Sequence, residues 1–252
     1  MLTPRRPTLL AQIYQIRGIG FIAPIYYFLH YIQSPLEKYT APDQRMVKIG
    51  KSKIIMPTIF ISYIIPVIAM FAAPELAARQ WINAFFFQPF PLWAVLVQYC
   101  LSRCVTDTTE KDKVHEDEAD MKYLRRGYLS AAVFSTIAYW YVYALAWQSS
   151  ISLVEVFFKD ITKPTTMQPL IEGASKVLRY DYLWSFSAGA LWTLLSFKDL
   201  KEAGKTSAGW GQIIGAFTII TLCAGPGTSM VVFWAWREEL LVSKTVPTSK
   251  KD

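Results

Sequence analysis

The chain of 252 residues is poor in the side chains that bind metals and redox groups. It has two histidines, His30 and His115, and three cysteines, none of them in a CxxC pair. Haem, di-iron and zinc sites need more ligands of these kinds than the sequence offers. Cys100 and Cys104 lie one helical turn apart, a spacing typical of packing rather than of a metal site. We therefore expect no metal and no cofactor.

Motifs for nucleotides, phosphates and nucleic acids are also missing. The sequence has no glycine-rich phosphate loop, no GxSxG elbow and no dinucleotide fingerprint. The net charge is +7, but the basic residues form no stripe interleaved with aromatic side chains, so we expect no nucleic acid partner. The acidic run at 116–120 has no second acidic motif to face it, as Mg²⁺-dependent ionisation of a prenyl diphosphate would require. We interpret this run as a solvated loop.

Long apolar runs dominate what is present. Apolar residues make up 53% of the chain, and several stretches approach the roughly 20 residues that a helix needs to cross a bilayer. The sequence predicts an all-α membrane protein with one transmembrane domain over residues 1–252. The six expected spans lie at 11–33, 54–73, 82–101, 127–147, 179–197 and 211–236. Prolines or a Gly-Pro-Gly sequence should kink or interrupt three of them.

A further apolar segment, 151–161, is too short to span a bilayer. We expect an interfacial or re-entrant helix there, with a seventh span as the alternative. The basic residues divide ten against fourteen between the two sides of the six-span arrangement, so they do not fix its orientation. The N-terminus lacks the pattern of a cleavable signal, so the first span should direct insertion. We expect membrane lipids as partners and a location in the endoplasmic reticulum.

The six-span arrangement gathers acidic residues on one face of the membrane. Asp181 begins the fifth span, while Glu238 and Glu239 follow the sixth, so antiparallel spans would place them together. The 151–161 segment adds Glu155 and Asp160. These five carboxylates are the candidate catalytic residues. The candidate substrate-binding residues around them are Arg17, His30, Phe157, Tyr180, Trp184, Trp234, Trp236 and Arg237.

A carboxyl group beside a wall of aromatic side chains suits carbocation chemistry. An apolar setting disfavours the carboxylate, which raises the pKa of such an acid toward neutrality. The acid protonates an alkene or an epoxide, aromatic faces attract the resulting cation, and a second carboxylate takes the final proton. Asp181 is the candidate proton donor. A lipophilic substrate would enter from the bilayer.

Simpler interpretations of the same residues stay open. Tryptophan and tyrosine at the ends of spans ordinarily form an interfacial belt. Glu238 and Glu239 would be solvated if they merely follow the last span. Asp181 would do no chemistry if it pairs with an arginine. His30 would be an interior hydrogen-bonded histidine, and Arg17 would extend its charge toward the headgroups.

Several stretches resemble a known family of small fungal integral-membrane proteins. The family is the membrane-bound terpene cyclases of meroterpenoid pathways, which make macrophorin- and ascofuranone-like compounds. This resemblance implies metal-free cyclisation of a farnesyl-type chain on an aromatic or polyketide-derived head, begun by protonating a terminal alkene or epoxide. It assigns no catalytic residue. The stretches are "FLHYIQSPLEKY" (28–39), "RQWINAFFFQPFP" (79–91), "SRCVTDTTEKD" (102–112), "RYDYLWSFSAGALWTLLSFKDLKEAG" (179–204) and "GPGTSMVVFWAWREE" (225–239).

Two other functions remain as alternatives. One is a membrane isomerase or epoxide hydrolase acting on a sterol-like or prenylated substrate, which would use the same acid but end the reaction differently. The other is not an enzyme but a small-molecule transporter or scaffold. A transporter predicts broken helices near the middle of the membrane, and Gly225-Pro226-Gly227 is such a break.

Overall fold

The structure is a computed structural model that describes residues 7–36, 47–106, 119–149, 152–159 and 170–242. Within these ranges the chain is almost entirely helical and contains no β-strand, which confirms the expected all-α class. Asp160 and the first three acids of the 116–120 run lie outside the described residues. Contacts divide the chain into two compact units, residues 1–22 with 41–127, and residues 23–40 with 128–252.

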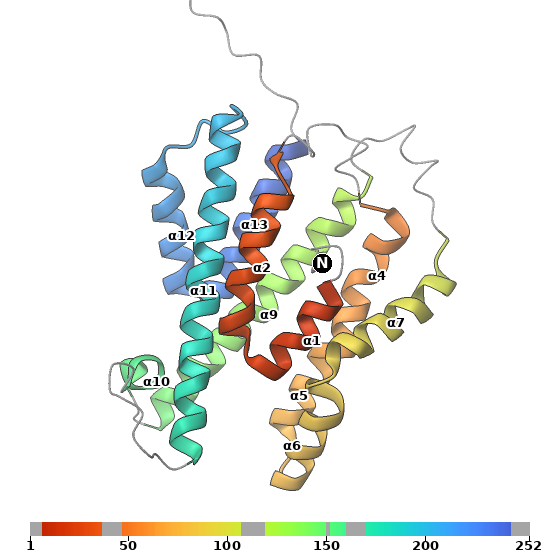
Figure 1. The fold of residues 1–252 in the computed structure, drawn as a ribbon, viewed down its shortest axis with the longest axis vertical. Coiled ribbons are helices and arrows are strands. Elements are labelled where there is room, and N and C mark those ends of the chain that lie inside the picture. Colours follow the sequence, from red (N-terminus) through yellow and green to blue (C-terminus); the bar gives the residue numbers. More distant parts are fainter. Residues whose placement is uncertain (1–6, 37–46, 107–118, 150–151, 160–169, 243–252) are drawn as a thin grey trace, which may run out of the picture. The chain divides into compact units, whose positions relative to one another are not determined.

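Figure 1 labels the α-helices along the chain; two further stretches, η2 and η3, are π-helical. The elements are α1 (Pro7–Arg17), α2 (Ile19–Gln33), α4 (Ile49–Ile59), η2 (Phe60–Ile64), α5 (Ile65–Ala72), α6 (Leu76–Ile82), η3 (Asn83–Phe87), α7 (Phe90–Cys104), α9 (Met121–Gln148), α10 (Leu153–Phe158), α11 (Leu170–Glu202), α12 (Trp210–Ala224) and α13 (Pro226–Val242).

In the first unit, α4, η2 and α5 form one helical run whose pitch changes at η2. Pro66 lies in the first turn of α5 and has no backbone N–H to donate. The hydrogen bonds before it widen to the π-helical spacing, so that the N–H of Ile65 donates to the carbonyl oxygen of Phe60. The α6–η3 segment then meets α7 at a bend of 57°. The Tyr63 and Phe90 rings lie 4.9 Å apart, which joins the two helical runs.

In the second unit, α11 and α13 run parallel to each other. The aromatic pairs follow the same order along both helices: Trp192 stacks on Trp234 at 4.3 Å, and Phe197 lies 4.7 Å from Trp236. Phe197 also packs against Phe233 in a core completed from α12 and from the segment after α2. This parallel register determines which charged residues meet at the end of the pair.

The expected span 211–236 is two helices rather than one. Gly225 separates α12 from α13 with φ 91°, a left-handed conformation that glycine adopts without strain. A Cβ at this position would lie 2.7 Å from the Tyr139 ring, so the close approach also requires glycine. The chain reverses here, and α12 and α13 pack as a hairpin.

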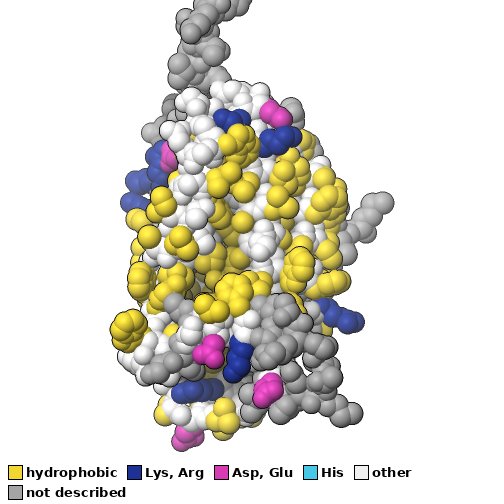
Figure 2. All heavy atoms as spheres, turned by 90° about the vertical axis from the view of Figure 1, so that its left-hand side faces the viewer, with side chains coloured by type: hydrophobic (Ala, Val, Ile, Leu, Met, Phe, Trp, Pro, Cys, Tyr) yellow, Lys and Arg dark blue, Asp and Glu magenta, His cyan; other side chains and the backbone are white. Residues whose placement is uncertain are grey.

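Two helical runs are long and apolar enough to cross a membrane, Ile49–Ala72 and Met121–Gln148. The bent pair Leu76–Phe87 and Phe90–Cys104 makes a third if it is one span. By length and composition, the described residues therefore support two or three spans, and the larger number expected stays a prediction. Gly18, with φ 89°, ends α1 and divides the expected span 11–33. Figure 2 shows hydrophobic side chains over the middle of the face that bears α10, α11 and α12, with charged ones mostly toward its two ends.

The short helix expected near 151–161 is present as α10. Its N-terminus is a capping box, in which the Ser152 hydroxyl accepts from the Val154 N–H and the Glu155 carboxylate accepts from the Ser152 N–H at 3.4 Å. Arg179 of α11 donates to the carbonyl oxygens of Val156 and Lys159, which holds the C-terminal end of the helix. The segment is therefore helical and fixed to α11, and its position in a membrane stays a prediction.

Candidate functional site

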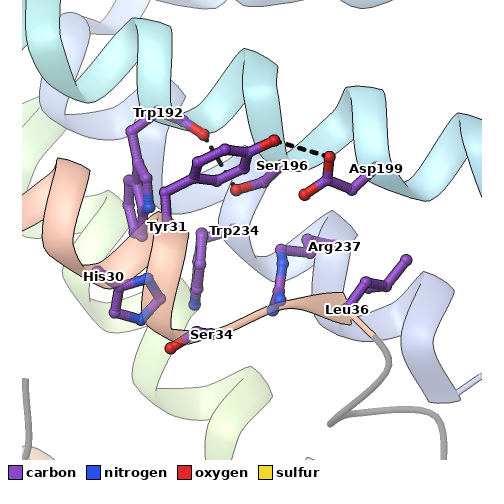
Figure 3. Close-up of a pocket in the computed structure, with 9 residues that line it drawn as sticks. All are labelled: His30, Tyr31, Ser34, Leu36, Trp192, Ser196, Asp199, Trp234 and Arg237. Carbon is purple, nitrogen blue, oxygen red and sulfur yellow. Dashed lines mark hydrogen bonds between the residues drawn. The ribbon is translucent and has the colours of Figure 1, made fainter.

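A small cavity lies in the second unit among three helical segments (Figure 3). Its volume is about 10 Å³, enough for about one water molecule. A space of this size has room for one small polar group. The lining residues are His30, Tyr31, Ser34 and Leu36 from α2 and the residues after it, Trp192, Ser196 and Asp199 from α11, and Trp234 and Arg237 from α13.

The α11 residues of the cavity lie on one face of the helix because they recur at positions i, i+4 and i+7. Ser196 Oγ donates to the Trp192 carbonyl oxygen at 3.0 Å, which satisfies the hydroxyl within its own helix. Asp199 comes one turn later, near the end of α11. The helix continues to Glu202, beyond the end at residue 197 that was expected for this span.

A hydrogen bond between α2 and α11 forms the polar edge of the cavity. The Tyr31 hydroxyl donates to Asp199 Oδ1 at 2.8 Å, across 168 positions of sequence. Burial, together with the hydrogen bond to Asp199 and the negative charge of that carboxylate, raises the pKa of Tyr31 to about 12. Tyr31 therefore remains a hydrogen-bond donor to Asp199 Oδ1 throughout the physiological pH range.

Three side chains that line the cavity, Trp192, Trp234 and Arg237, belong to a stack that Tyr27 extends. Tyr27 stacks on Trp192 at 4.9 Å, Trp192 stacks on Trp234 at 4.3 Å, and the Arg237 guanidinium lies 4.5 Å from the centre of the Trp234 ring. Each tryptophan therefore has both faces covered by a neighbour. Arg237 thus lies over one face of the Trp234 ring, and the expected role of Trp234 in substrate binding stays a prediction.

The polar side chains at the cavity differ in their charge and in their hydrogen-bond partners. Arg237 is buried and pairs with Glu238 at 2.8 Å, a pair whose side chains are 7% and 13% exposed. His30 lies edge-on to Trp192, with ring centres 5.2 Å apart. Burial, and then the positive charge of Arg237, lowers the pKa of His30, so the imidazole is neutral near pH 7. Trp192 Nε1 is buried and has no hydrogen-bond partner among the described residues.

The predicted meeting of Asp181 with Arg237, Glu238 and Glu239 does not occur. Because α11 and α13 are parallel, Arg237 lies in register with Asp199 and not with Asp181. Asp181 is 18 positions earlier on the same continuous helix, which is about 27 Å along its axis. The prediction failed because it took α12 and α13 as one span. A catalytic role for Asp181 by itself stays a prediction.

The other predicted residues are dispersed. Glu155 caps α10, and Phe157 packs on Tyr182 with ring centres 4.8 Å apart. Trp236 belongs to the core around Phe197. Trp184 and Tyr180 are exposed on α11, and Arg17 is exposed at the end of α1. Glu239 is half-buried one residue after the Arg237–Glu238 pair. Of the predicted residues, His30, Trp234 and Arg237 line the cavity.

Sequence reasoning missed Tyr31, Trp192, Ser196 and Asp199. The spacing of Trp192, Ser196 and Asp199 was a usable signal, because it predicts one face of a helix. Tyr31 had no comparable signal, since its partner is distant in sequence. No group of three or more His, Cys, Asp or Glu side chains in the described ranges is arranged to hold a metal ion. Asp120 is buried and accepts from the Val47 N–H at 2.9 Å.

Comparison with known proteins identifies the family. Residues 3–242 match the model of the CtvD domain, and the chain belongs to this family. It is 32% identical to the FAD-dependent monooxygenase BOA8 of Botryotinia fuckeliana, over 95% of this chain and 30% of that protein. It is 30% identical to the FAD-dependent monooxygenase verC1 of Penicillium polonicum, over 94% of this chain and 29% of the relative.

A more distant relative is the terpene cyclase ascI of Acremonium egyptiacum, 23% identical over 74% of this chain and 50% of ascI. The chain spans about a third of the length of the monooxygenases that it matches. No solved structure matches the chain.

The described residues do not fit the FAD in the monooxygenases' names. Dinucleotide folds place the pyrophosphate at a glycine-rich turn between a strand and a helix. The described part of the chain has no strand, and the sequence has no such glycine-rich motif. The matched region therefore offers no recognisable dinucleotide site.

Proposed function

We propose that this chain is a membrane-bound enzyme of fungal secondary metabolism that opens an epoxide on a lipophilic, prenylated substrate. The observation that carries the proposal is the Asp199 carboxyl group, held by Tyr31 at the edge of a cavity with room for one oxygen-bearing group. Membership of the CtvD domain family and the similarity to ascI support enzymatic work on such substrates. The apolar helical runs support a membrane location, for which we propose the endoplasmic reticulum.

The polar lining of the cavity favours an epoxide over an alkene as the reacting group. Trp192 Nε1 has a hydrogen to donate, and an epoxide oxygen would accept it. A plain alkene would leave such buried polar groups without a partner, which is unfavourable. The monooxygenase relatives add to this argument, because the name describes an enzyme that transfers one oxygen atom to a substrate, and such a transfer to an alkene would give an epoxide.

Asp199 acts as the proton donor in this proposal. The reacting form is the protonated acid, in which Oδ1 accepts the Tyr31 hydrogen bond and Oδ2 holds the proton that passes to the epoxide oxygen. One C–O bond of the epoxide breaks, and the oxygen becomes a hydroxyl. Tyr31 stabilises the carboxylate that remains. The neutral imidazole of His30 takes the final proton, and exchange with solvent restores both residues.

Cyclisation of a farnesyl-type chain is the first way for this reaction to end. A double bond of the same chain attacks the opened carbon, a ring forms, and the last cation loses a proton to His30. The product is then an isomer of the substrate. The resemblance to meroterpenoid cyclases and the relationship to ascI support this ending.

Hydrolysis is the second candidate, and a specific observation favours it. The cavity has the volume of one water molecule beside Asp199 and His30, and both faces of each tryptophan are covered. A water molecule there attacks the epoxide carbon while His30 takes its proton and Asp199 protonates the oxygen. This route forms no free carbocation, so it needs no exposed aromatic face.

One experiment tests the proposal and separates its two endings. Membranes containing the full chain are incubated in H₂¹⁸O with a farnesylated phenol that carries a terminal epoxide, and the products are analysed by mass spectrometry. A cyclase gives a product of unchanged mass without ¹⁸O. A hydrolase gives a diol that has gained one labelled water. Equal conversion of the analogue without the epoxide, or no conversion of the epoxide, would contradict the proposal.

A further inference from the structure

Two free thiols lie at the C-terminal end of α7. Cys100 and Cys104 are one helical turn apart, and both are exposed. Cys104 Sγ donates to the Cys100 carbonyl oxygen at 3.7 Å, and the spacing of four residues puts both side chains on one face of the helix. The packing role that this spacing suggested does not fit their exposure. Both thiols are therefore available to a reagent from outside the chain.

The residues around these thiols mark a boundary between apolar and polar sequence. Residues 80–102 contain no charged residue, whereas 103–113 contain six. The Arg103 guanidinium lies 4.8 Å from the centre of the Tyr99 ring and donates to the Tyr99 hydroxyl. Tyrosine and arginine are typical of the depth at which hydrocarbon meets headgroups. Cys100 and Cys104 thus flank the point where an embedded α7 would leave the hydrocarbon.

The length of α7 is short for a bilayer. Its 15 residues extend about 22 Å, while the hydrocarbon core is roughly 30 Å thick. A bend of 57° separates α7 from the α6–η3 segment before it. A hydrophobic helix shorter than the core draws its polar end inward or thins the bilayer, and both are unfavourable. An additional apolar group at the end of α7 would reduce this mismatch.

The direction of side chains on α7 suits an attached apolar chain. In a helix the Cα–Cβ bond tilts toward the N-terminus, so side chains near the C-terminal end of α7 point back along the helix. Cys100 therefore points toward Leu96 and Leu92, one and two turns earlier, and both leucines are exposed. A chain joined to the Cys100 sulfur would lie over these leucines and extend into the hydrocarbon.

We propose that Cys100 and Cys104 are sites of S-acylation by a long-chain fatty acid. The thiolate sulfur attacks the carbonyl carbon of a long-chain acyl-coenzyme A, and a new thioester forms. The bond between the acyl group and coenzyme A breaks, and coenzyme A leaves as a thiol with the proton that the cysteine lost. Cysteines beside the end of a membrane span are typical sites of this modification. The proposal rests on the membrane location and is independent of the reaction at Asp199.

The test counts thioesters on the full chain in membranes of a fungal host. Free thiols are blocked with N-ethylmaleimide, thioesters are cleaved with neutral hydroxylamine, and each released thiol is coupled to a maleimide polymer that retards the protein on a gel. We expect the unchanged chain to carry up to two polymers, and only after hydroxylamine. Cys100→Ser and Cys104→Ser should each carry at most one, and the double variant none. Both positions are exposed, so serine should change stability little.

Cys223 provides the matched control. It is exposed on α12, but it lies within 206–236, a stretch without a charged residue, so it lacks the polar boundary of Cys100 and Cys104. Cys223→Ser should leave the hydroxylamine-dependent shifts unchanged. A chain without such shifts, or shifts lost in Cys223→Ser, would overturn the proposal. Shifts that need dithiothreitol and not hydroxylamine would show a disulfide and overturn it as well. Activity on the epoxide substrate is measured separately, so neither proposal decides the other.

Discussion

The two ends of α11 carry similar side chains and use them differently. Near Asp181, Arg179 holds the end of α10 through two backbone carbonyls, and Tyr182 packs against Phe157. Near Asp199, the same kinds of side chains enclose a cavity, because residues from α2 and α13 meet α11 there. Aromatic and charged residues do not by themselves mark a site. What distinguishes the Asp199 end is the hydrogen bond that joins its carboxylate to another helix.

The largest expected difference between the two ends is in catalysis. Asp199→Asn keeps the shape of the side chain and removes the acid, so it should lower the rate of epoxide opening at least about 100-fold. Asp181→Asn should change the rate less than about threefold, because Asp181 lies far from the cavity. Product formation per amount of folded protein measures both. A large loss in Asp181→Asn with normal activity in Asp199→Asn would reverse the assignment.

The second prediction concerns the tryptophans of α11. Trp192→Phe retains an aromatic ring in the stack but loses the Nε1–H, so it should lower the rate roughly tenfold. Trp184→Phe changes an exposed ring nearer the other end and should stay within about twofold. Rates at saturating and limiting substrate separate binding from chemistry. Equal rates in Trp192→Phe and Trp184→Phe would contradict a role for Trp192 in the reaction.

The third prediction tests whether the Asp181 end is structural. Arg179→Gln removes the guanidinium that bonds Val156 and Lys159, so α10 should detach more often. Limited proteolysis within 152–159 should become several times faster, while the rate of epoxide opening changes less than about threefold. Lys198→Gln serves as the charge-matched control. If Arg179→Gln lowered the rate of epoxide opening as far as Asp199→Asn does, α10 would be part of the catalytic site.

The smallest effect expected is a pH dependence of stability from His30. The folded-state pKa of His30 lies below its ordinary value, so the unfolded chain binds more protons in the interval between the two values. The stabilisation by the neutral imidazole is therefore present above about pH 6.5 and is lost as the pH falls through this interval. Between pH 7 and pH 5, the Tm should drop about 2–4 °C more for the unchanged chain than for His30→Gln. An equal fall in Tm for the two proteins between pH 7 and pH 5 would show that His30 is not held neutral.

The sequence predicted local features well and long-range ones poorly. The helical class and the α10 helix followed from apolar periodicity and length, which are properties of neighbouring residues. The cavity depends on Tyr31 meeting Asp199, and no local pattern specifies that contact. The Asp181 prediction failed at Gly225, which was recognised as a break but interpreted as an interruption within one span rather than a reversal. The direction of the chain after that glycine decided which carboxylate stands beside Arg237.

The one-residue turn at Gly225 also bears on the order of folding. Its hairpin makes contacts between residues close in sequence, and such contacts form quickly because little loop entropy is lost. The α12–α13 pair is thus expected to form early. The Tyr31–Asp199 contact must close a loop of 168 residues, which makes it one of the slowest to form. During synthesis α2 leaves the ribosome before α11 has been made. The candidate site is therefore completed only when most of the chain has been synthesised.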